Sequence, residues 1–340
     1  DEYGAIVLAG VSRREDKLVL LARELHLLDD TDFLPGVHGY RQFSAKAVAT
    51  FAGRAGNEEL AYVAIHSHPH FGPTNLSSDD LDSHRKLFPH LLDLTESQPV
   101  CGIALSQDSA DGELWQVDSK PLRLSLIRVI GKELMQLGPS TPSSQAAGPS
   151  STQQAERRFD RQARLFGDVG QEILRGMHVG VIGAGGGGSM IIEQLAHLGV
   201  GRLTIIDYDI VKEHNLSRIV GATPEDAERA LKKVDVARRL VSTVDPKIKC
   251  QTIDGDIAEL EVADKLLDCH YLFLATDTTT SRLVLNAIVH RYLIPALQIG
   301  VKVETDKEEA ITDIYLAIRP ILPDQGCLNC HGLIDPMRLQ

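Results

Sequence analysis

HVGVIGAGGGGSM, residues 178–190, carries the strongest fold signal in the chain, because an apolar run leads into a cluster of glycines and then into a helical pattern. We expect a buried strand that ends at Ile182 and a helix that begins at Ser189. Glycines between a strand and a helix permit a tight turn and let phosphate oxygens approach backbone N–H groups at the helix N-terminus. The segment therefore predicts a phosphate-binding turn. Its candidate residues are Gly183, Gly185 and Gly188.

Asp207 closes the next apolar run, 24 residues after Gly183. A Rossmann unit places a carboxylate at about this spacing on the ribose hydroxyls of a nucleotide. The glycine pattern alone is equally typical of a nicotinamide or flavin dehydrogenase. Residues farther along the chain favour a different enzyme.

The second half alternates apolar runs with helical stretches such as Ser189–Gly199. This alternation requires right-handed βαβ crossovers and a parallel, doubly wound sheet. The first half interleaves short β-rich runs with possible helices near Ser44–Ala55 and Ser77–Leu94, which indicates a compact α/β unit. Between them, GPSTPSSQAAGPSSTQQ has the composition of a flexible linker. We predict an α/β chain with domains at 1–137 and 155–340, joined by a linker at 138–154.

Composition excludes several functional classes. The chain has 340 residues and 43% apolar content, which suffices for two cores. A formal net charge of −12 argues against nucleic acid as a partner, since binding to a phosphate backbone depends on clustered Lys and Arg. There is no membrane-length apolar run and no signal peptide pattern, so we expect a cytoplasmic protein without a membrane partner. The chain begins without Met and stops soon after Cys330, as a fragment would.

HSHPHFGPTNLSSDD, residues 66–80, has the residue types of an open metal site. His66 and His68 follow an apolar run, and alternate side chains of a strand share one face, so both rings can converge on one ion. A carboxylate from the following loop or helix would be the third ligand. Three protein ligands leave a tetrahedral Zn²⁺ one open position for water.

This stretch resembles the JAMM/MPN (JAB) metalloproteases, whose pattern is His-x-His-Pro, a short loop and Ser-x-x-Asp, with a glutamate upstream. The resemblance implies a JAB/MPN fold at 1–137 and makes His66, His68 and Asp80 the ligands. It implies that Ser77 hydrogen-bonds the developing oxyanion. Glu2 would take a proton from the metal-bound water and deliver it to the leaving amine. The loop is one residue longer than usual, so Asp79 is an alternative ligand, although Leu76 would then replace the serine. Glu15 and Glu24 also lie upstream and are alternatives to Glu2. We expect His70 and His84 in loops or on the surface and not among the ligands.

The segment from Arg158 to Arg218 resembles the E1/ThiF/MoeB-type activating enzymes, which adenylate the C-terminal glycine of ubiquitin-like proteins. The family's elements occur here in order: RFDRQARLFG, LGVGRLTIIDYDIVKEHNLSR, KKVDVARRL and ATDTTTSR. The resemblance implies that Asp207 binds the ribose, with Asp209 nearby, and that Asp277 binds Mg²⁺. It also implies that the ATP phosphates are contacted by Asn215, Arg218 and Lys233, and by Arg161 across a homodimer interface.

Cys327 and Cys330 resemble the first half of the structural zinc knuckle of this family, whose second Cys-x-x-Cys pair does not occur in the chain. His331 is a conceivable substitute ligand but fits packing or surface better. The other three cysteines, Cys101, Cys250 and Cys269, lie in or beside apolar runs, where we expect buried thiols without a role. Five cysteines of this kind fit a reducing compartment.

The two resemblances together imply a bifunctional enzyme of a bacterial ubiquitin-like pathway that uses Zn²⁺, ATP and Mg²⁺. One half would trim a precursor or conjugate, and the other would adenylate the exposed C-terminal glycine, and an E2-like protein would be a further partner. Two alternatives stay open. The chain could activate a sulfur carrier for cofactor biosynthesis, or its first half could bind the modifier without cutting it.

Overall fold

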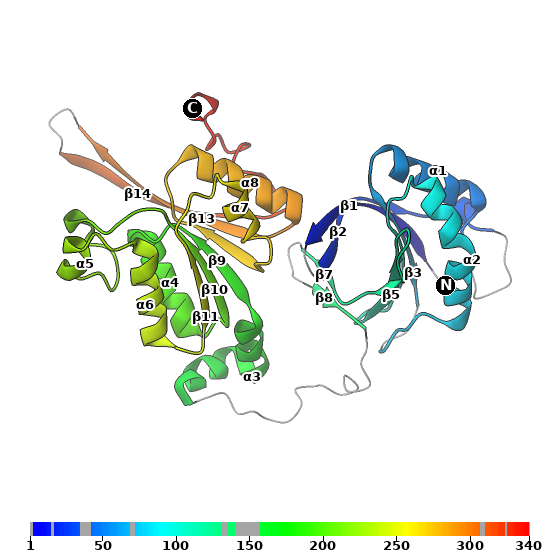
Figure 1. The fold of residues 1–340 in the computed structure, drawn as a ribbon, viewed down its shortest axis with the longest axis horizontal. Helices are drawn as coiled ribbons and strands as arrows, with labels where there is room; N and C mark the ends of the chain where they lie inside the picture. The colour runs from blue at the N-terminus through cyan, green and yellow to red at the C-terminus, as the bar shows by residue number, and fades with distance from the viewer. Residues whose placement is uncertain are drawn as a thin grey trace. The chain divides into compact units, whose positions relative to one another are not determined.

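The computed structural model of the protein (Figure 1) describes residues 3–14, 17–34, 42–68, 72–130, 135–139, 157–306, 310–323 and 325–339. The chain divides into two compact units, Asp1–Gly148 and Pro149–Gln340. This division falls inside the segment 138–154 that the composition predicts to be a linker, most of which lies outside the described residues. No helix among the described residues is both long and apolar enough to cross a membrane.

The first unit is built on a six-stranded mixed sheet with the order β2-β1-β3-β4-β5-β6. β3 and β4 are parallel, and the other neighbours are antiparallel. The strands are β1 (Gly4–Arg14), β2 (Lys17–Leu27), β3 (Ala61–Ser67), β4 (Val100–Leu105), β5 (Ala110–Trp115) and β6 (Leu122–Arg123). A separate antiparallel pair consists of β7 (Ile127–Val129) and β8 (Met135–Leu137).

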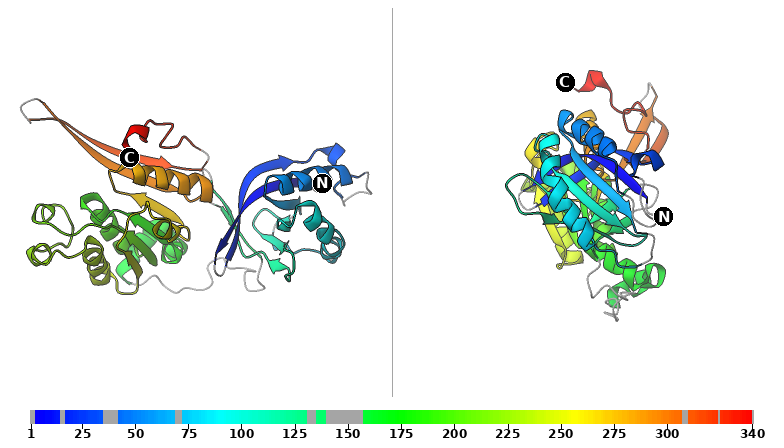
Figure 2. Two further views of the ribbon diagram at one scale, coloured as in Figure 1. Left: turned by 45° about the horizontal axis from the view of Figure 1, so that its top comes forward. Right: turned by 90° about the vertical axis from the view of Figure 1, so that its right-hand side faces the viewer.

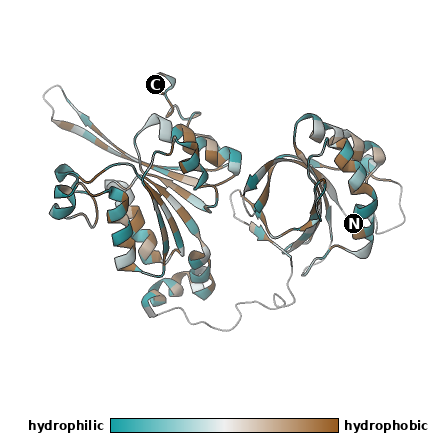
Figure 3. Ribbon diagram, viewed as in Figure 1, coloured by the Kyte–Doolittle hydropathy of each residue, from teal (hydrophilic) through white to brown (hydrophobic). Residues whose placement is uncertain are grey.

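Two helices pack on one face of this sheet, α1 (Ala45–Asn57) and α2 (Ser78–Leu94). Parallel strands need a crossover connection, and α2 is the crossover from β3 to β4. Ile6 and Leu8 of β1 face the same core as Phe88 and Leu91 of α2. The alternate residues of β1 face a second core on the opposite side of the sheet, as the strand period of two requires. Both faces of β1 are therefore apolar, and Figure 3 shows hydrophobic residues, in brown, along the strands of this unit.

The second unit contains a six-stranded sheet with the order β11-β10-β9-β12-β13-β14. The first five strands are parallel to one another, and β14 is antiparallel to β13. The strands are β9 (His178–Ile182), β10 (Arg202–Ile206), β11 (Lys249–Ile253), β12 (Tyr271–Leu274), β13 (Ala296–Thr305) and β14 (Ile311–Ile321). This order is that of a doubly wound Rossmann-like sheet, so the predicted fold of the second half is confirmed.

Helices cover both faces of this sheet. α4 and α6 share one core with β9 and β10, and α7 and α8 share the other with β12 (Figure 1). The helices of this unit are α3 (Asp160–Gly176), α4 (Gly186–Leu198), α5 (Pro224–Glu228), α6 (Lys233–Val244), α7 (Leu260–Asp264) and α8 (Thr279–Tyr292). Short 3-10 turns are η1 (Asp30–Asp32) in the first unit and η2 (Arg157–Phe159), η3 (Glu213–Asn215) and η4 (Pro336–Arg338) in the second. Figure 2 shows the paired ends of β13 and β14 extending beyond the helices.

Asp226 of α5 is a buried carboxylate that accepts several hydrogen bonds. It is 5% exposed, and its two oxygens accept hydrogen bonds at 2.8 and 2.6 Å from Arg239 of α6. Its Oδ2 also accepts the backbone N–H of Thr223, the N-cap of α5. The hydrogen bonds from Arg239 hold the pKa of Asp226 well below its usual range, although burial opposes them. This pair ties α5 to α6, which begins with Lys233.

Asp226→Asn should destabilise α5 and α6 by about 1–3 kcal/mol at neutral pH, because a charged, doubly bonded group loses its charge. A depressed pKa contributes stability above the unfolded value of about 3.9 and loses it as the pH falls below that value, so the difference between variant and wild type should shrink on acidification. Hydrogen–deuterium exchange of peptides from 224–244 measures the local free energy. Glu225→Gln, on an exposed pair with Arg229, is the control and should change it by less than about 0.5 kcal/mol. Equal effects of the two variants would contradict this account.

Candidate functional site

His66, His68 and Asp80 form a cluster at the junction of β3 and α2. Their nitrogen and carboxylate ligand atoms all lie within 4.8 Å of one another. Nε2 of His66 lies 3.2 Å from Nε2 of His68 and 3.5 Å from Oδ1 of Asp80. Two ligands about 2.1 Å from a tetrahedral Zn²⁺ are about 3.4 Å apart, so this donor set fits one such ion. No other group among the described residues brings three such atoms together.

Asp80 owes its place to the start of α2. Ser77 is the N-cap: its hydroxyl accepts the N–H of Asp80 at 3.1 Å and donates to Oδ2 of Asp80 at 2.7 Å, and Oδ2 also accepts the N–H of Ser77. The predicted Ser-x-x-Asp element is therefore a reciprocal capping box. It holds Oδ2 and leaves Oδ1 facing His66. Burial raises the pKa of Asp80, but hydrogen bonds from His66 and Ser77 outweigh it and keep that pKa well below its usual range. The alternative Asp79 is exposed and outside the cluster.

Of the three upstream glutamates, the structure describes only Glu24. Glu2, Glu15 and His70 lie outside the described residues. Tyr3, the neighbour of Glu2, donates its N–H to the hydroxyl of Ser67, which stands between the two histidines, and its carbonyl accepts the N–H of Ser67. Glu24 of β2 forms a surface ion pair with Arg54 of α1 and is not part of the metal cluster.

The expectation that His84 lies in a loop or on the surface is wrong. His84 is 8% exposed on α2, where it stacks on Phe88 and packs against Gly102 of β4. Its Nδ1 lies 2.9 Å from the carboxylate of Glu113, which also accepts the indole N–H of Trp115. Burial lowers the pKa of His84, and Glu113 opposes that shift. Glu113 is 29 residues away, so no local pattern reveals this partner.

The glycine turn lies at the carboxyl end of β9. Gly183 has φ +95°, a conformation that glycine adopts without strain. α4 begins at Gly186, three residues before the predicted Ser189, so the later glycines form its first turn. Gly185 is the N-cap, and no side chain caps the helix. The N–H groups of this first turn are therefore available to an anion.

Asp207 lies beside this turn, at the end of β10. Its Oδ2 accepts the N–H of Ala184 at 2.7 Å, and its Oδ1 accepts the N–H of Asp209 at 2.8 Å. Burial raises the pKa of Asp207, and the two backbone hydrogen bonds oppose that shift. Lys233, at the start of α6, places Nζ 2.6 Å from Oδ2 of Asp209. The structure thus brings Asp207, Asp209 and Lys233 together at one edge of the sheet.

Three further predicted residues surround the same edge. The side chain of Arg218 lies against Gly186, since a Cβ added there would meet its Cδ at 3.2 Å. Asn215 is 5% exposed and accepts the N–H of Lys212, so its side chain shapes the chain leading to Arg218. Asp277 is exposed and follows β12, next to residues that pack on Gly183. Burial raises the pKa of Tyr208, and the charges of nearby carboxylates add to that rise, including Asp209 and Asp277.

Arg161 is not brought to this edge within one chain. It is exposed on α3, which leads into the amino end of β9. Its neighbour Gln162 donates to the carbonyl of His197 at the last turn of α4, whereas the glycine turn is at the first. A helix of 13 residues is about 20 Å long, so a large gap separates Arg161 from the glycine turn.

Cys327 and Cys330 lie in a turn held by α8. Their sulfur atoms are 3.5 Å apart, and the N–H of Cys330 points at Sγ of Cys327, which lowers the pKa of that thiol. Asn286 of α8 accepts the N–H of Leu328. Neither a third ligand nor His331 joins the pair in a metal-sized cluster within the described part of the chain. Cys101 and Cys269 are buried as expected, whereas Cys250 is only partly buried.

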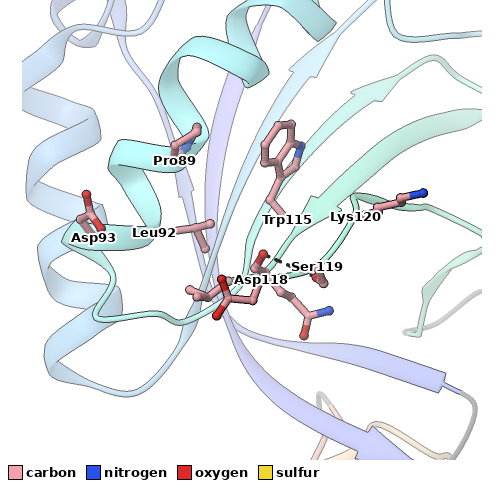
Figure 4. A pocket seen from close by; sticks show the side chains of 9 residues that line it. Pro89, Leu92, Asp93, Trp115, Asp118, Ser119 and Lys120 are labelled. Atoms are coloured by element: carbon pink, nitrogen blue, oxygen red, sulfur yellow. Dashed lines mark hydrogen bonds between the residues drawn. The ribbon is translucent and has the colours of Figure 1, made fainter.

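A shallow hollow in the first unit lies apart from the metal cluster (Figure 4). Trp115 lies on one side of it and Leu92 and Pro89 of α2 on the other. Because Leu92 is 12 residues after Asp80 on α2, the hollow lies about 18 Å along the helix from the cluster. The turn after β5 completes it with Asp118, Ser119 and Lys120.

Comparison with known proteins concerns the second unit. A model of the ThiF family matches residues 159–338, more than half of the chain. The chain belongs to the ThiF family. The prediction from the sequence motifs of that region is thereby confirmed at the level of the family. The match does not extend to the metal cluster of the first unit.

Relatives of this ThiF family member include enzymes with two kinds of name. The tRNA threonylcarbamoyladenosine dehydratase of Escherichia coli strain K12 is 29% identical over 145 residues, 42% of this chain and 53% of the relative. The ubiquitin-like modifier-activating enzyme 5 of Drosophila willistoni is 26% identical over 209 residues, 53% of this chain and 49% of the relative. The chain thus spans about half the length of the curated relatives it matches.

Solved structures give matches of similar extent. The structure of the E. coli tRNA dehydratase TcdA in complex with ATP is 27% identical, with a TM-score of 0.41 over 44% of this chain and 62% of that chain. The structure of E. coli MccB with ATP is 22% identical, with a TM-score of 0.42 over 53% of both chains.

Gly188→Ala should distort the glycine turn, because the added methyl group would overlap the carbonyl oxygen of Gly183. We expect a loss of about 1–3 kcal/mol of local stability, as for other overpacked sites. Gly187→Ala is the matched control, since a Cβ there meets nothing within 4 Å. Hydrogen–deuterium exchange of peptides from β9 and α4 should be accelerated in the first variant only. Equal protection in the two variants would show that the turn is not closely packed.

Proposed function

We propose that the second unit is an E1-like adenylyltransferase that activates the C-terminal glycine of a ubiquitin-like protein. The observation that supports this most is the meeting of the glycine turn, Asp207 and Lys233 at the carboxyl edge of the sheet in a ThiF family chain. Ligands of open α/β sheets bind at this edge, where the strand order reverses. The reversal here lies between β9 and β12, which the glycine turn and Asp277 follow.

In the proposed reaction, a carboxylate oxygen of the modifier attacks the α-phosphorus of ATP. The bond from that phosphorus to the bridging oxygen breaks, and pyrophosphate leaves with the electron pair. Negative charge spreads during this step, so fixed cations and N–H donors aimed at the phosphates are the main catalytic contribution. A Mg²⁺ bound through Asp277 would neutralise part of the same charge.

Each residue of the edge has a role in this proposal. Asp207 receives the ribose hydroxyls, and the uncapped first turn of α4 receives phosphate oxygens. Arg218 lies against that turn. Lys233 would break its ion pair with Asp209 and bind a phosphate instead. Asn215 holds the segment that leads to Arg218.

Arg161 would act across a homodimer interface, since its own chain holds it near the last turn of α4. The exposed apolar side chains of α3 support such an interface. Leu165 and Ile173 are 77% and 61% exposed. Exposed apolar side chains that gather on one helix are typical of protein–protein interfaces.

The names of the relatives leave two substrate classes, a tRNA nucleoside and a ubiquitin-like modifier. The net charge of −12 favours the protein, because a tRNA-binding chain needs clustered cations to neutralise phosphates. We therefore propose a small protein with a C-terminal glycine as the partner. A sulfur-carrier protein has the same tail and would be adenylated by the same edge.

Lys233→Ala should reduce ATP–pyrophosphate exchange about a hundredfold or more, the usual effect of removing a cation or donor that acts on developing charge. The exchange is measured with radiolabelled pyrophosphate and a β-grasp protein that ends in glycine. Lys249→Ala, at the exposed amino end of β11, is the control and should exchange like the wild type. Exchange that is equally fast in Lys233→Ala, or independent of the terminal glycine, would contradict the proposal.

We propose further that the first unit is a zinc-dependent isopeptidase or protease for the same modifier. The separations of 3.2 and 3.5 Å among His66, His68 and Asp80 support zinc as the ion. When bound, Zn²⁺ would polarise a carbonyl and lower the pKa of a water. Glu2, next to Tyr3, would carry the proton to the leaving amine. Ser77 orients Asp80 through the capping box, and its hydroxyl would have to turn away from Asp80 to reach an oxyanion.

His66→Ala should lose about one zinc per chain and all cleavage of a C-terminally extended modifier, since two remaining ligands cannot hold the ion. Metal content is measured by mass spectrometry on the purified full chain. His90→Ala, on the exposed side of α2, should keep both zinc and cleavage. Zinc without cleavage in the wild type would favour a first unit that only binds the modifier, and zinc unchanged in His66→Ala would refute the metal site.

A further inference from the structure

The segment 72–77, which joins the histidines to α2, forms neither helix nor strand. Its residues alternate between exposed and buried, with Thr74 and Leu76 facing inward. Thr74 is fully buried and Leu76 is 8% exposed. Buried backbone N–H groups must find acceptors, and outside helices and sheets those acceptors are carbonyls of other loops and turns, side chains or water.

The acceptors come from one place, the turn between β4 and β5 and the start of β5. Ser109 accepts the N–H of Thr74 at 2.9 Å, and Asp111 accepts the N–H of Leu76 at 2.9 Å. Asp108 accepts the N–H of Gly72 at 3.1 Å. The hydroxyls of Ser106 and Ser109 both donate to the carbonyl of Gly72 at 3.0 Å. We call these four side chains, Ser106, Asp108, Ser109 and Asp111, the β4–β5 clamp.

Asp111 is the most constrained member of the clamp. It is fully buried, and Arg123 of β6 donates to its two oxygens at 2.8 and 2.6 Å. Oδ1 also accepts the N–H of Gly112 at 2.8 Å. Because Oδ2 also accepts the N–H of Leu76, each carboxylate oxygen accepts two hydrogen bonds. A carboxylate fixed by the sheet in this way gives the loop a rigid anchor.

Among the described residues, the first turn of α2 is otherwise attached to the sheet by the contact of Asp80 with His66. Its buried side chains begin at His84, so residues 78–83 contribute none to the core. His66 is fixed by the pairing of β3 with β1 and β4, and the N–H of His68 donates to the carbonyl of Leu105 at the end of β4. Apart from its contact with His66, Asp80 is held through the loop and the cap. A ligand held by a mobile turn would not stay 3.5 Å from His66.

We infer that the β4–β5 clamp positions Asp80 for metal binding by anchoring the loop that carries Ser77. The inference rests on the proposed metal site and adds residues that the metal-binding motif does not contain. Residues that orient a metal ligand usually affect affinity about 10–100-fold when they are removed.

The test compares zinc affinity in Ser109→Ala and Asp111→Asn with that of the wild-type full chain. Affinity is measured by competition with a chromophoric chelator, and Co²⁺ absorption reports the ligand geometry. The single tryptophan, Trp115, lies in the first unit and reports its unfolding in the same samples. Matched controls are Ser119→Ala and Asp118→Asn in the next turn of the same sheet, at the hollow of Figure 4.

We expect the clamp variants to bind zinc at least about tenfold more weakly, with an altered Co²⁺ spectrum, well below the temperature at which Trp115 reports unfolding. The controls should bind like the wild type. Asp108→Ala removes the acceptor of the Gly72 N–H from an exposed position and gives the same comparison if Ser109→Ala does not fold.

The measurements separate a failure of the clamp inference from a failure of the proposed metal site. Clamp variants that lose thermal stability but keep the wild-type zinc affinity and Co²⁺ spectrum would show a purely structural role and overturn the inference, while the proposed metal site stands. A wild-type chain whose zinc content does not depend on His66 would overturn the metal site itself, and the positioning role with it.

Discussion

Every α-helix begins with backbone N–H groups that have no partner within the helix, and both candidate sites are arranged around how this chain satisfies those groups. α2 and α4 are the next helices after β3 and β9, and Asp80 in the first turn of α2 lies beside His66 near the end of β3. At α2, Ser77 and Asp80 satisfy the N–H groups with side chains, and the same carboxylate turns its free oxygen toward two histidines. At α4, glycines supply no side chain and leave the N–H groups open. One constraint thus gives a metal-ligand geometry in one unit and an anion-binding geometry in the other.

The capping box also explains why Asp80 remains ionised in a partly buried place. Its position in the first turn of α2 puts a negative charge where the helix dipole favours one. Hydrogen bonds from His66 and Ser77 reinforce this and exceed the cost of burial. A carboxylate must be ionised to bind a metal, so the cap and the ligand role require the same protonation state. Asp79 lacks the cap, which explains physically why the structure brings Asp80 and not its neighbour to the histidines.

The features that sequence alone predicts are those whose signal is contiguous in the chain. The pair His66 and His68, the glycine turn and Asp207 each follow an apolar strand, and strand geometry fixes where they emerge. α4 starts three residues earlier than the sequence predicts, because glycine disfavours helices and the packing of the remaining helix outweighs that preference. His84 and Asp111 could not be predicted, since their partners Glu113 and Leu76 are brought close only by the pairing of β4 with β5 and the crossover through α2. Polar residues that alternate along a β-strand normally indicate a solvent face, and in β5 they are buried instead.

In the proposed adenylation, the pair of Lys233 and Asp209 would hold a cation ready for phosphate at low cost. Lys233 is 11% exposed, whereas Asp209 is 51% exposed, so the ammonium group has already lost most of its water and the carboxylate has not. A phosphate that displaced Asp209 would replace one anion by another at a cation that needs no further desolvation, and the released carboxylate could return to water. Burying an unpaired ammonium group for the same purpose would cost several kcal/mol. Asp209 would then lie beside Asp207 and within the field of Asp277, where a divalent cation that accompanies the phosphates could compensate its charge. In the proposed function, the ion pair is thus a placeholder for ATP rather than a contribution to folding.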